Sequence, residues 1–576
     1  MMRFALAGAL LAQLAAGAAP PAWVSRSNEH AKVALATIAE FSPESAGGLG
    51  LEGHDERIFD LRPQSYERFL QANRKVLAEL EKRRNTERDP LVRQDIDITI
   101  DAVKESIEGA ELGRKYRLPY YNMGQVVFGG IRSLLDDQVA AGRRPAAVTR
   151  LKRYAGLDEG YTPVTKLAED RIRERLAVPG LIGPPRDQVE KDLKNSSFFI
   201  DGLGPLFIKY KLTGHEEALA KLKAQLATYN EFVRTEVLPR SREDFRLPPE
   251  LYAFSLRSFG IDIPPAELAA MAHTAFDSIQ KEMDAVAAKV AKDRKLAVSG
   301  YRNVIRELKK EQLAGDSIVT HYRERIGQIE EIIRRENLVS LPERPARMRL
   351  ASPAESAGQP APNMRPPRLI GNTGESGEFV LPLANPSAAA GSRMDDFTFA
   401  AASWTLTAHE ARPGHEMQFS AMVEQGVSNA RAIFAFNSTN VEGWGLYSEH
   451  ILFPFMPPEG QLISLQHRLM RAGRAFLDPE LQSGKVTLAE AKQILMNDVL
   501  LSEPMATQEI DRYAFRAPGQ ATSYFYGYTK LLALRQDVER KTGAKFKARE
   551  FHDFILSQGL LPPAMLRAAV EQKFLR

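Results

Sequence analysis

Two histidines and several carboxylates gather in two short runs, His409–Gln418 and Glu442–Glu449. Imidazole nitrogens and carboxylate oxygens are the ligands of hydrolytic zinc sites, which use three protein ligands and leave one position open. The sequence therefore predicts one Zn²⁺ ion bound by His409, His415 and Glu442. The same donors would also accept other divalent transition metals, so the identity of the metal stays open.

The spacing of the two histidines does not suit an unbroken helix. His409 and His415 are six residues apart, which is about 240° of rotation around an α-helix. Pro413 and Gly414 lie between them, and a proline cannot donate to the carbonyl four residues earlier, that of His409. The pattern predicts that the helix kinks or restarts here, which would allow His415 to turn back toward His409.

Other residues in these runs have predicted roles around the ligands. Glu410 is placed to act as the general base that takes a proton from the attacking water. Glu449 follows Glu442 by seven residues, so it shares the same helical face and could orient a histidine from behind. Gln418 is predicted to support the site in the same way. The alternative is a pair of buried core histidines whose hydrogen bonds are satisfied without a metal.

A second cluster, nearer the C-terminus, could help to bind and stabilise a substrate. Tyr524 and Tyr528 are four residues apart on one helical face, and either hydroxyl could donate to the oxyanion that forms when water adds to an amide. Arg512 and Arg516 could bind a substrate carboxylate through two parallel hydrogen bonds. The alternative is an aromatic face that only packs.

Three motifs occur in order after residue 400: His-Glu-x-x-Pro-Gly-His-x-x-Gln, Glu-Gly-Trp-Gly-Leu-Tyr-x-Glu and Pro-Gly-Gln-Ala-x-x-Tyr-x-x-Gly. In them the chain resembles the bacterial family called domain of unknown function 885, over most of its mature length. That family is similar to helical zinc peptidases of the gluzincin type. The resemblance implies a mainly α catalytic fold around a cleft, with His409, His415 and Glu442 as ligands and Glu410 as base. Family members often carry a second histidine where this chain has Glu416.

The elements that must position these residues are predicted to be helices. Apolar residues recur at three- and four-residue spacing in Tyr66–Leu80, Leu268–Val290 and Asp316–Ile333. Helical patterning returns at Met394 and continues to the end of the chain. Phe397–Ala408 is apolar on nearly all sides, so it is predicted to be a buried helix that leads into the histidine motif.

The stretch from Leu341 to Pro386 is rich in proline and interrupts the helices. Met348–Leu350 and Gly377–Pro382 resemble short strands, and the proline in the second indicates an edge strand. We expect a small antiparallel β element before the active-site helix, whose edge could bind an extended peptide; the alternative is a disordered linker. The predicted fold is mainly α, a large helical single-chain fold with a central cleft.

Four segments are predicted along the chain: a signal peptide at 1–19, an N-terminal helical region at 20–340, the proline-rich segment at 341–392 and a helical catalytic region at 393–576. Residues 1–19 have a short positive start, an apolar centre and small residues before Pro20, which is typical of a cleavable signal peptide. The 576 residues include no cysteine, which excludes disulfides, thiol catalysis and a lipidated cysteine. We expect a soluble periplasmic or secreted product that is neither a lipoprotein nor inserted in the membrane.

The charge of the chain gives little indication of a macromolecular partner. The formal net charge is +4 and no dense basic block is present, so nucleic acid is not expected to bind. The favoured hypothesis is an exported zinc metallopeptidase that cleaves short or unfolded peptides, with a peptide or small amide as substrate. Two alternatives stay open: a zinc hydrolase of non-peptide amides or esters, and a non-catalytic periplasmic helical protein that binds a ligand or a metal. No oligomeric state is predicted.

Overall fold

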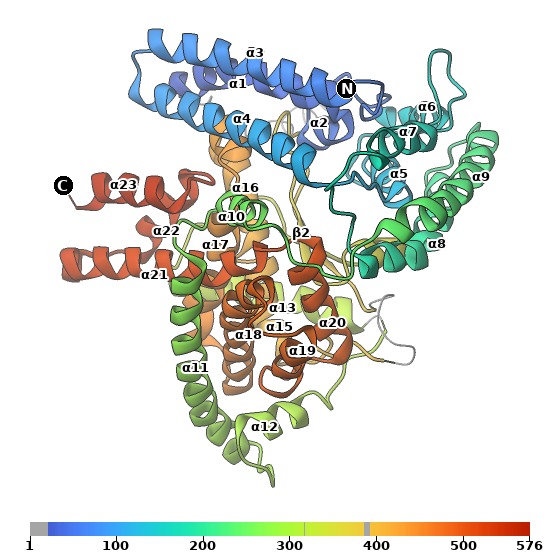
Figure 1. Cartoon of the computed structure of the whole chain (residues 1–576). Coiled ribbons are helices and arrows are strands. Elements are labelled where there is room, and N and C mark those ends of the chain that lie inside the picture. The colour runs from blue at the N-terminus through green and yellow to red at the C-terminus, as the bar shows by residue number, and fades with distance from the viewer. Residues whose placement is uncertain (1–20, 316, 385–391, 576) are drawn as a thin grey trace, which may run out of the picture.

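The computed structural model describes residues 21–315, 317–384 and 392–575, and these residues are mainly helical (Figure 1). They form 23 α-helices and one three-stranded sheet, which confirms the predicted mainly α fold. The predicted signal peptide at 1–19 lies outside the described residues. Within the described ranges, no helix is both long enough and apolar enough to cross a lipid bilayer.

Nine helices form the first part of the described chain. They are α1 (Ala22–Phe41), α2 (Pro43–Leu49), α3 (Ser65–Thr86), α4 (Pro90–Tyr116), α5 (Met123–Arg132), α6 (Ala146–Tyr154), α7 (Val164–Leu176), α8 (Arg186–Lys209) and α9 (Glu216–Phe232). Helices α1, α3 and α4 pack together at the top of the view, and α5 to α9 form a second group to the right (Figure 1). Each group has an apolar core of its own.

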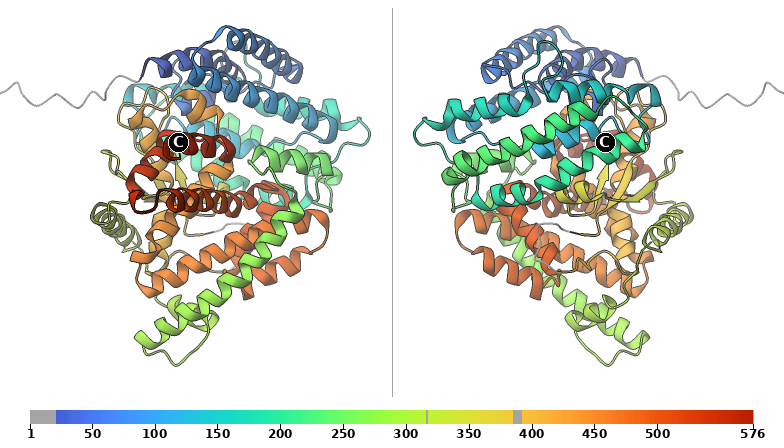
Figure 2. Two further views of the ribbon diagram at one scale, coloured as in Figure 1. Left: turned by 90° about the vertical axis from the view of Figure 1, so that its left-hand side faces the viewer. Right: turned by 90° about the vertical axis from the view of Figure 1, so that its right-hand side faces the viewer.

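The next four helices pack against the C-terminal half of the chain. They are α10 (Pro249–Ser258), α11 (Pro265–Asp293), α12 (Tyr301–Leu308) and α13 (Ser317–Arg335). Helix α11 packs along α18 (Pro458–Ser483), which it crosses in the turned view on the left of Figure 2. Residues of both helices belong to one large apolar core. By packing, the helices of residues 249–335 therefore belong with the C-terminal half.

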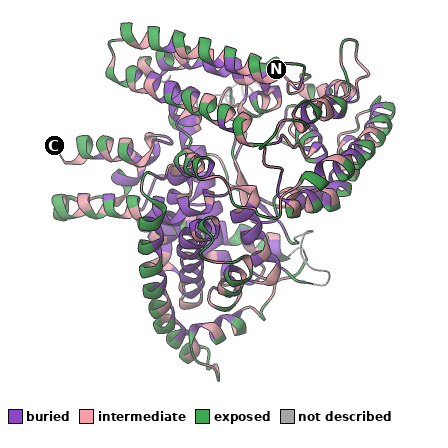
Figure 3. Ribbon diagram, in the orientation of Figure 1, coloured by how far each residue is buried: buried purple, intermediate pink, exposed green. Residues whose placement is uncertain are grey.

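The remaining helices surround the histidine motif. They are α15 (Ala402–Glu410), α16 (His415–Gln425), α17 (Ser438–Leu452), α19 (Leu488–Asn497), α20 (Glu503–Asp511), α21 (Ser523–Thr542), α22 (Ala548–Ser557) and α23 (Pro563–Phe574). Most residues of helices α15, α17 and α18 are buried, and buried residues gather at the centre of the molecule (Figure 3). The histidine motif therefore lies in a deeply buried region, as predicted.

Three of the predicted helices are confirmed as α3, α11 and α13. The prediction of a helix over Phe397–Ala408 is wrong in its first part, because α15 begins only at Ala402. The backbone before it forms hydrogen bonds sideways instead of along a helix: the Leu313 amide donates to the Thr398 carbonyl. The apolar pattern of this segment predicts its burial, but it cannot predict a backbone hydrogen bond to a distant part of the chain.

The sheet consists of β1 (Arg347–Leu350), β2 (Asn363–Arg365) and β3 (Glu378–Leu381), in the order β1-β3-β2. β2 and β3 are antiparallel as predicted, but β1 and β3 are parallel, so the sheet is mixed. The connection between β1 and β3 contains α14 (Pro353–Gly358) and β2, and this length permits parallel pairing.

The proline of this segment does not mark an edge strand, which corrects the prediction. Strand β3 is the central strand and ends at Leu381, one residue before Pro382, so the ladder loses no donor. The linker alternative is wrong for the described part of the segment, because residues 347–381 form the sheet and α14.

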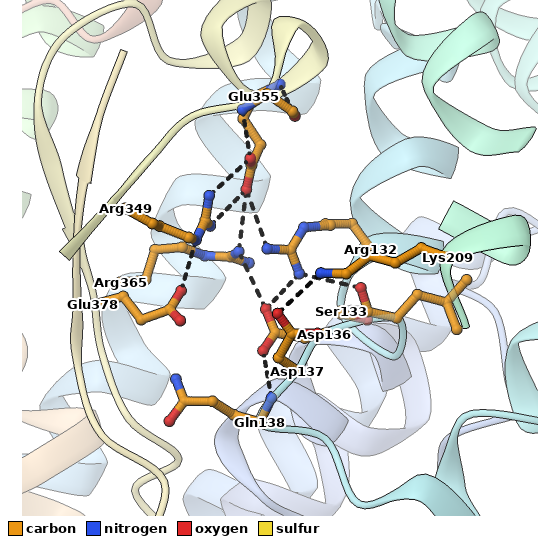
Figure 4. Close-up of polar contacts among 12 residues, drawn as sticks. Arg132, Ser133, Asp136, Asp137, Gln138, Lys209, Arg349, Glu355, Arg365 and Glu378 are labelled. Atoms are coloured by element: carbon orange, nitrogen blue, oxygen red, sulfur yellow. Dashed lines mark hydrogen bonds and ion pairs between the residues drawn. The ribbon is translucent and has the colours of Figure 1, made fainter. Parts of the chain in front are cut away.

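An ionic network joins α5 to the sheet (Figure 4). It consists of Arg132, Arg349, Arg365, Asp136, Glu355 and Glu378. Glu355, on α14, accepts a hydrogen bond from Arg349 at 2.8 Å and lies 3.3 Å from guanidinium nitrogens of both Arg132 and Arg365. Three arginines therefore face three carboxylates, so the charges within the network are matched.

Replacement of Glu355 with glutamine tests the contribution of this network. Burial opposes ionisation, but the neighbouring arginines outweigh it and lower the pKa of Glu355 from 4.5 to about 2. Because the folded pKa lies below the unfolded one, the stabilisation is present above pH 4.5 and is lost as the pH falls toward 2. We expect Glu355→Gln to lower the free energy of unfolding at pH 7 by roughly 3 kcal/mol.

The measurement is denaturant unfolding followed by circular dichroism between pH 3 and pH 7. Wild type should lose more stability over the acidic part of this range than Glu355→Gln. The exposed Glu331→Gln on α13 is the control and should behave like wild type. Equal stability of all three proteins at pH 7 would show that the network does not hold α5 to the sheet.

Candidate metal centre

The helix that carries the first histidine ends where the sequence predicts a break. α15 ends at Glu410 and α16 begins at His415, and the Arg412–Pro413 peptide bond between them is cis. The indole nitrogen of Trp444, on α17, donates to the Pro413 carbonyl at 2.9 Å. Gly414 is required at this point, because a Cβ atom there would lie 1.8 Å from the carbonyl oxygen of His409. The predicted restart of the helix is confirmed.

The break brings the three predicted ligands together. The Nε2 atoms of His409 and His415 lie 3.5 and 3.2 Å from Oε2 of Glu442, and the three donor atoms all lie within 4.8 Å of one another. The imidazole centroids are 4.6 Å apart with the rings nearly perpendicular. Glu442 lies in the second turn of α17, whose N-terminus is capped by the Asn437 side chain.

The donor set fits a tetrahedral zinc ion. Ligand atoms about 2.0–2.2 Å from such an ion stand about 3.3–3.6 Å apart, close to the two separations from Oε2 of Glu442. That oxygen is buried and makes no hydrogen bond with any described residue, although two imidazole nitrogens face it. A buried carboxylate oxygen without a partner is unfavourable, and a cation held between the three donors would remove this cost.

Behind His409, a carboxylate fixes the orientation of the ring. Oε1 of Glu449 lies 2.7 Å from Nδ1 of His409, and the hydroxyl of Thr405 donates to the other carboxylate oxygen. Glu449 was predicted to occupy this position because it shares a helical face with Glu442. An Nδ1–H bonded to a carboxylate leaves Nε2 as the unprotonated nitrogen that can bind a metal.

The two carboxylates also determine the charge of His409. Burial alone would lower the pKa of His409, but the nearby carboxylates of Glu442 and Glu449 outweigh it and raise this pKa to about 9. Burial opposes ionisation of Glu449 as well, yet Arg471 and His409 lower the pKa of Glu449 to about 2. In the absence of a competing cation, these carboxylates therefore favour the protonated form of His409.

A glycine of α17 makes room for both rings. A Cβ atom on Gly445 would lie 2.7–2.9 Å from ring atoms of His409 and His415. This is closer than real Cβ contacts, so a side chain at position 445 would displace the imidazoles. The sequence analysis did not single out Gly445, although it stands inside the quoted Glu-Gly-Trp-Gly motif and three residues after Glu442.

The two predicted tyrosines contact different neighbours in the structure. The ring of Tyr524 stacks on His409, with centroids 6.0 Å apart, and its hydroxyl accepts a hydrogen bond from Arg512 at 2.7 Å. The hydroxyl of Tyr528 lies 3.2 Å from Nδ1 of His450 instead. None of the ring or hydrogen-bond contacts described for Tyr528 is with the three candidate ligands.

Two arginines of α18 that were not predicted lie beside Tyr524. The guanidinium carbons of Arg471 and Arg474 lie 5.7 and 4.4 Å from the centre of the Tyr524 ring. Arg474 forms two hydrogen bonds of 2.6 Å with the buried Glu509. No local spacing could have predicted this group, because α18, α20 and α21 meet only in the folded chain.

The remaining predicted residues differ in their contacts. Glu410 is the last residue of α15, is 7% exposed, and its charge contributes to the raised pKa of His409. Gln418 donates to the Asn440 side chain at 2.9 Å. Arg516 lines a separate cavity. Glu416 is held by Arg412 and Ser420.

Comparison with known proteins agrees with the fold and the motifs. The fold and the site define a class of mainly helical proteins with a buried group of two histidines and one glutamate. The chain belongs to the family described as "Bacterial protein of unknown function (DUF885)", whose model matches residues 43–570. This confirms the family resemblance. A comparison with curated proteins finds no match.

Two solved structures share this fold at low sequence identity. A protein from Colwellia psychrerythraea, described as a "putative lipoprotein", is 18% identical with a TM-score of 0.75, over 96% of this chain and 99% of that chain. A protein of unknown function from Shewanella oneidensis, with the same description, is 18% identical with a TM-score of 0.66, over 96% of this chain and all of that one. At this identity the likeness shows the fold alone.

The charge coupling behind His409 can be measured directly. We expect Glu449→Gln to lower the pKa of His409 clearly below 9, because one of the carboxylates that stabilise the imidazolium becomes neutral. The measurement is an NMR titration of ¹³C-labelled histidine in the presence of a chelator. His552, which burial holds at a pKa of about 4, is the internal control and should not move. An unchanged pKa of His409 in Glu449→Gln would show that Glu449 does not interact with the candidate centre.

Proposed function

We propose that this protein is a zinc-dependent hydrolase, specifically a metallopeptidase that acts on short or unfolded peptides. The observation that carries the proposal is the convergence of His409, His415 and Glu442, whose donor atoms lie within 4.8 Å of one another. Glu449 behind His409 adds the carboxylate that commonly orients a zinc-bound histidine. A zinc ion held by these residues would supply a Lewis acid that activates water and polarises a carbonyl.

Glu410 and Tyr524 supply the proton transfer and charge stabilisation in this proposal. The Glu410 carboxylate takes a proton from water as the water oxygen bonds to the amide carbon. It then delivers that proton to the leaving nitrogen as the C–N bond breaks, which yields an amine and a carboxylic acid, and the acid releases its remaining proton to solvent. Burial raises the pKa of Tyr524, so its hydroxyl stays protonated and can donate to the oxyanion while Arg512 bonds to its oxygen.

Export is part of the proposal. The positive start, apolar centre and small residues of the segment 1–19 support a signal peptide. The two similar structures are each described as a "putative lipoprotein", and an exported location agrees with that description.

Zinc content and turnover together test the proposal. Purified protein reloaded with zinc is expected to hold about one ion per chain by elemental analysis, and to release fragments from a library of short peptides. Glu410→Gln should keep the zinc and lose at least about 100-fold in turnover, because only the base is removed. Bound zinc together with hydrolysis of esters but not of peptides would favour a non-peptide hydrolase. Zinc without any turnover would favour a metal-binding protein.

A pair of glycine variants controls for the geometry of the site. Gly445→Ala should lose most of the zinc, because its Cβ would displace both imidazoles. Gly473→Ala on α18 is the matched control, since its Cβ would meet Phe276 at an ordinary 3.5 Å. If Gly445→Ala binds as much zinc as Gly473→Ala, the ion is not held by these histidines.

The two tyrosines form a second matched pair. We expect Tyr524→Phe to lower kcat by about 10- to 100-fold, because it removes an oxyanion donor while keeping the ring that stacks on His409. Tyr528→Phe should stay near wild type, since its hydroxyl faces His450. The measurement is steady-state peptide hydrolysis, with thermal unfolding recorded for both variants. A larger loss in Tyr528→Phe than in Tyr524→Phe would contradict the assignment.

A further inference from the structure

A cavity of about 1020 Å³ lies where the N-terminal helices meet the C-terminal half of the chain. Its walls come from the start of α3, the end of α4, α7, and the two segments 182–188 and 514–518. Six arginines line it: Arg114, Arg117, Arg171, Arg175, Arg242 and Arg516. We refer to it as the arginine cavity.

The charges of the arginine cavity are not matched. Only two of its lining residues, Glu67 and Glu174, carry a carboxylate. Glu67 pairs with Arg114 at 3.4 Å, and Glu174 pairs with Arg171. In the described part of the chain, no carboxylate forms an ion pair within 4 Å with Arg117, Arg175, Arg242 or Arg516. Carboxylates act on three of them only at longer range: Glu67 on Arg175, Asp244 on Arg242, and Asp192 and Asp511 on Arg516. The network around Glu355, by contrast, has one carboxylate for each arginine.

Two of the unpaired guanidinium groups are held in place by neutral backbone groups. Arg242 donates to the carbonyls of Gly183 at 3.0 Å and Arg246 at 2.9 Å. Arg175 donates to the Arg114 carbonyl at 2.6 Å, and its Nε atom is buried without a hydrogen-bond partner. Carbonyl groups position a cation without neutralising it. A partly buried cation without a carboxylate in direct contact is costly, so this arrangement favours an anionic ligand.

We propose that the arginine cavity binds the carboxylates of an acidic oligopeptide. A volume near 1020 Å³ is at the upper end of small-molecule sites, and is more than a single small anion would fill. Tyr120, Tyr121 and Phe515 also line it and offer apolar contacts for the parts of a peptide between its carboxylates. The planar guanidinium fork matches a carboxylate with two hydrogen bonds.

One chain segment runs from the wall of the cavity to a neighbour of the candidate metal centre. Residues 514–518 form one wall, and Arg512, two residues before this wall, bonds to the tyrosine that stacks on His409. The inference rests on the proposed peptidase function for its role, because it makes acidic peptides the preferred substrate class. The binding itself does not require catalysis.

Binding is measured in the full-length Glu410→Gln protein, so that the probe is not cleaved. The probe is a fluorescein-labelled peptide of alternating glutamate and alanine, compared with its glutamine-for-glutamate isostere by fluorescence anisotropy. We expect the acidic peptide to bind at least tenfold more tightly, since hydrogen bonds to charged groups contribute more than neutral ones. Its affinity should fall as salt is added.

Arginine variants locate the binding. Arg117→Gln should weaken the acidic peptide about tenfold, and it leaves the fold intact because no hydrogen bond of the Arg117 side chain is described. Arg540→Gln, which removes an exposed arginine at the end of α21, is the matched control and should not change binding. Thermal unfolding of both variants verifies that they are folded.

Equal affinity for the acidic peptide and its isostere would overturn the proposal, as would equal losses in Arg117→Gln and Arg540→Gln. Binding of inorganic phosphate that is weakened by Arg117→Gln, without binding of the acidic peptide, would overturn it in favour of a phosphorylated ligand. Charge-selective binding without hydrolysis by wild type would support the arginine cavity and contradict the peptidase. Hydrolysis by wild type with equal binding of the two peptides would support the peptidase and contradict the arginine cavity.

Discussion

The geometry of the candidate metal centre depends on the break between α15 and α16. An unbroken helix would point the two histidines in different directions, because six residues correspond to about 240° of rotation. In the structure, Trp444 bonds to the Pro413 carbonyl, and the missing side chain of Gly414 lets the chain pass close to the carbonyl of His409. His415 therefore begins a new helix with its ring 4.6 Å from that of His409.

Helix α17 provides the other half of the same arrangement. Glu442, Gly445 and Glu449 share one face of this helix, because they are spaced by three and four residues. The first faces both imidazoles, the second makes room for them, and the third bonds behind His409. Trp444, one residue before the glycine, holds the break. One helix thus determines both the position and the orientation of the rings, which explains why acidic, aromatic and small residues alternate in this motif.

How much the sequence predicts depends on whether an interaction is local. The helix break and the shared face of Glu442 and Glu449 follow from spacing along one or two turns, and both are present in the structure. The start of α15, the parallel pairing of β1 and the arginines of α18 were not predicted, because each depends on a partner far away in the chain. The two tyrosines show the limit most clearly. Tyr524 and Tyr528 share a helical face, yet only Tyr524 stacks on His409, since that face meets two different neighbours along its length.

The charged clusters of this protein are of two kinds. In one kind every arginine is paired with a carboxylate, and in the arginine cavity several arginines are not, which favours an anionic ligand. Around Glu355 every arginine has a carboxylate, and Arg474 has Glu509, so the charges of these buried groups are matched. In the arginine cavity four guanidinium groups lack such a partner. Backbone carbonyls hold two of them in fixed positions, which keeps their charge available while limiting the entropy lost when an anion binds. Because residues 512–518 run from the tyrosine contact at His409 to the wall of this cavity, one short segment would connect substrate recognition with the chemistry proposed for the metal centre.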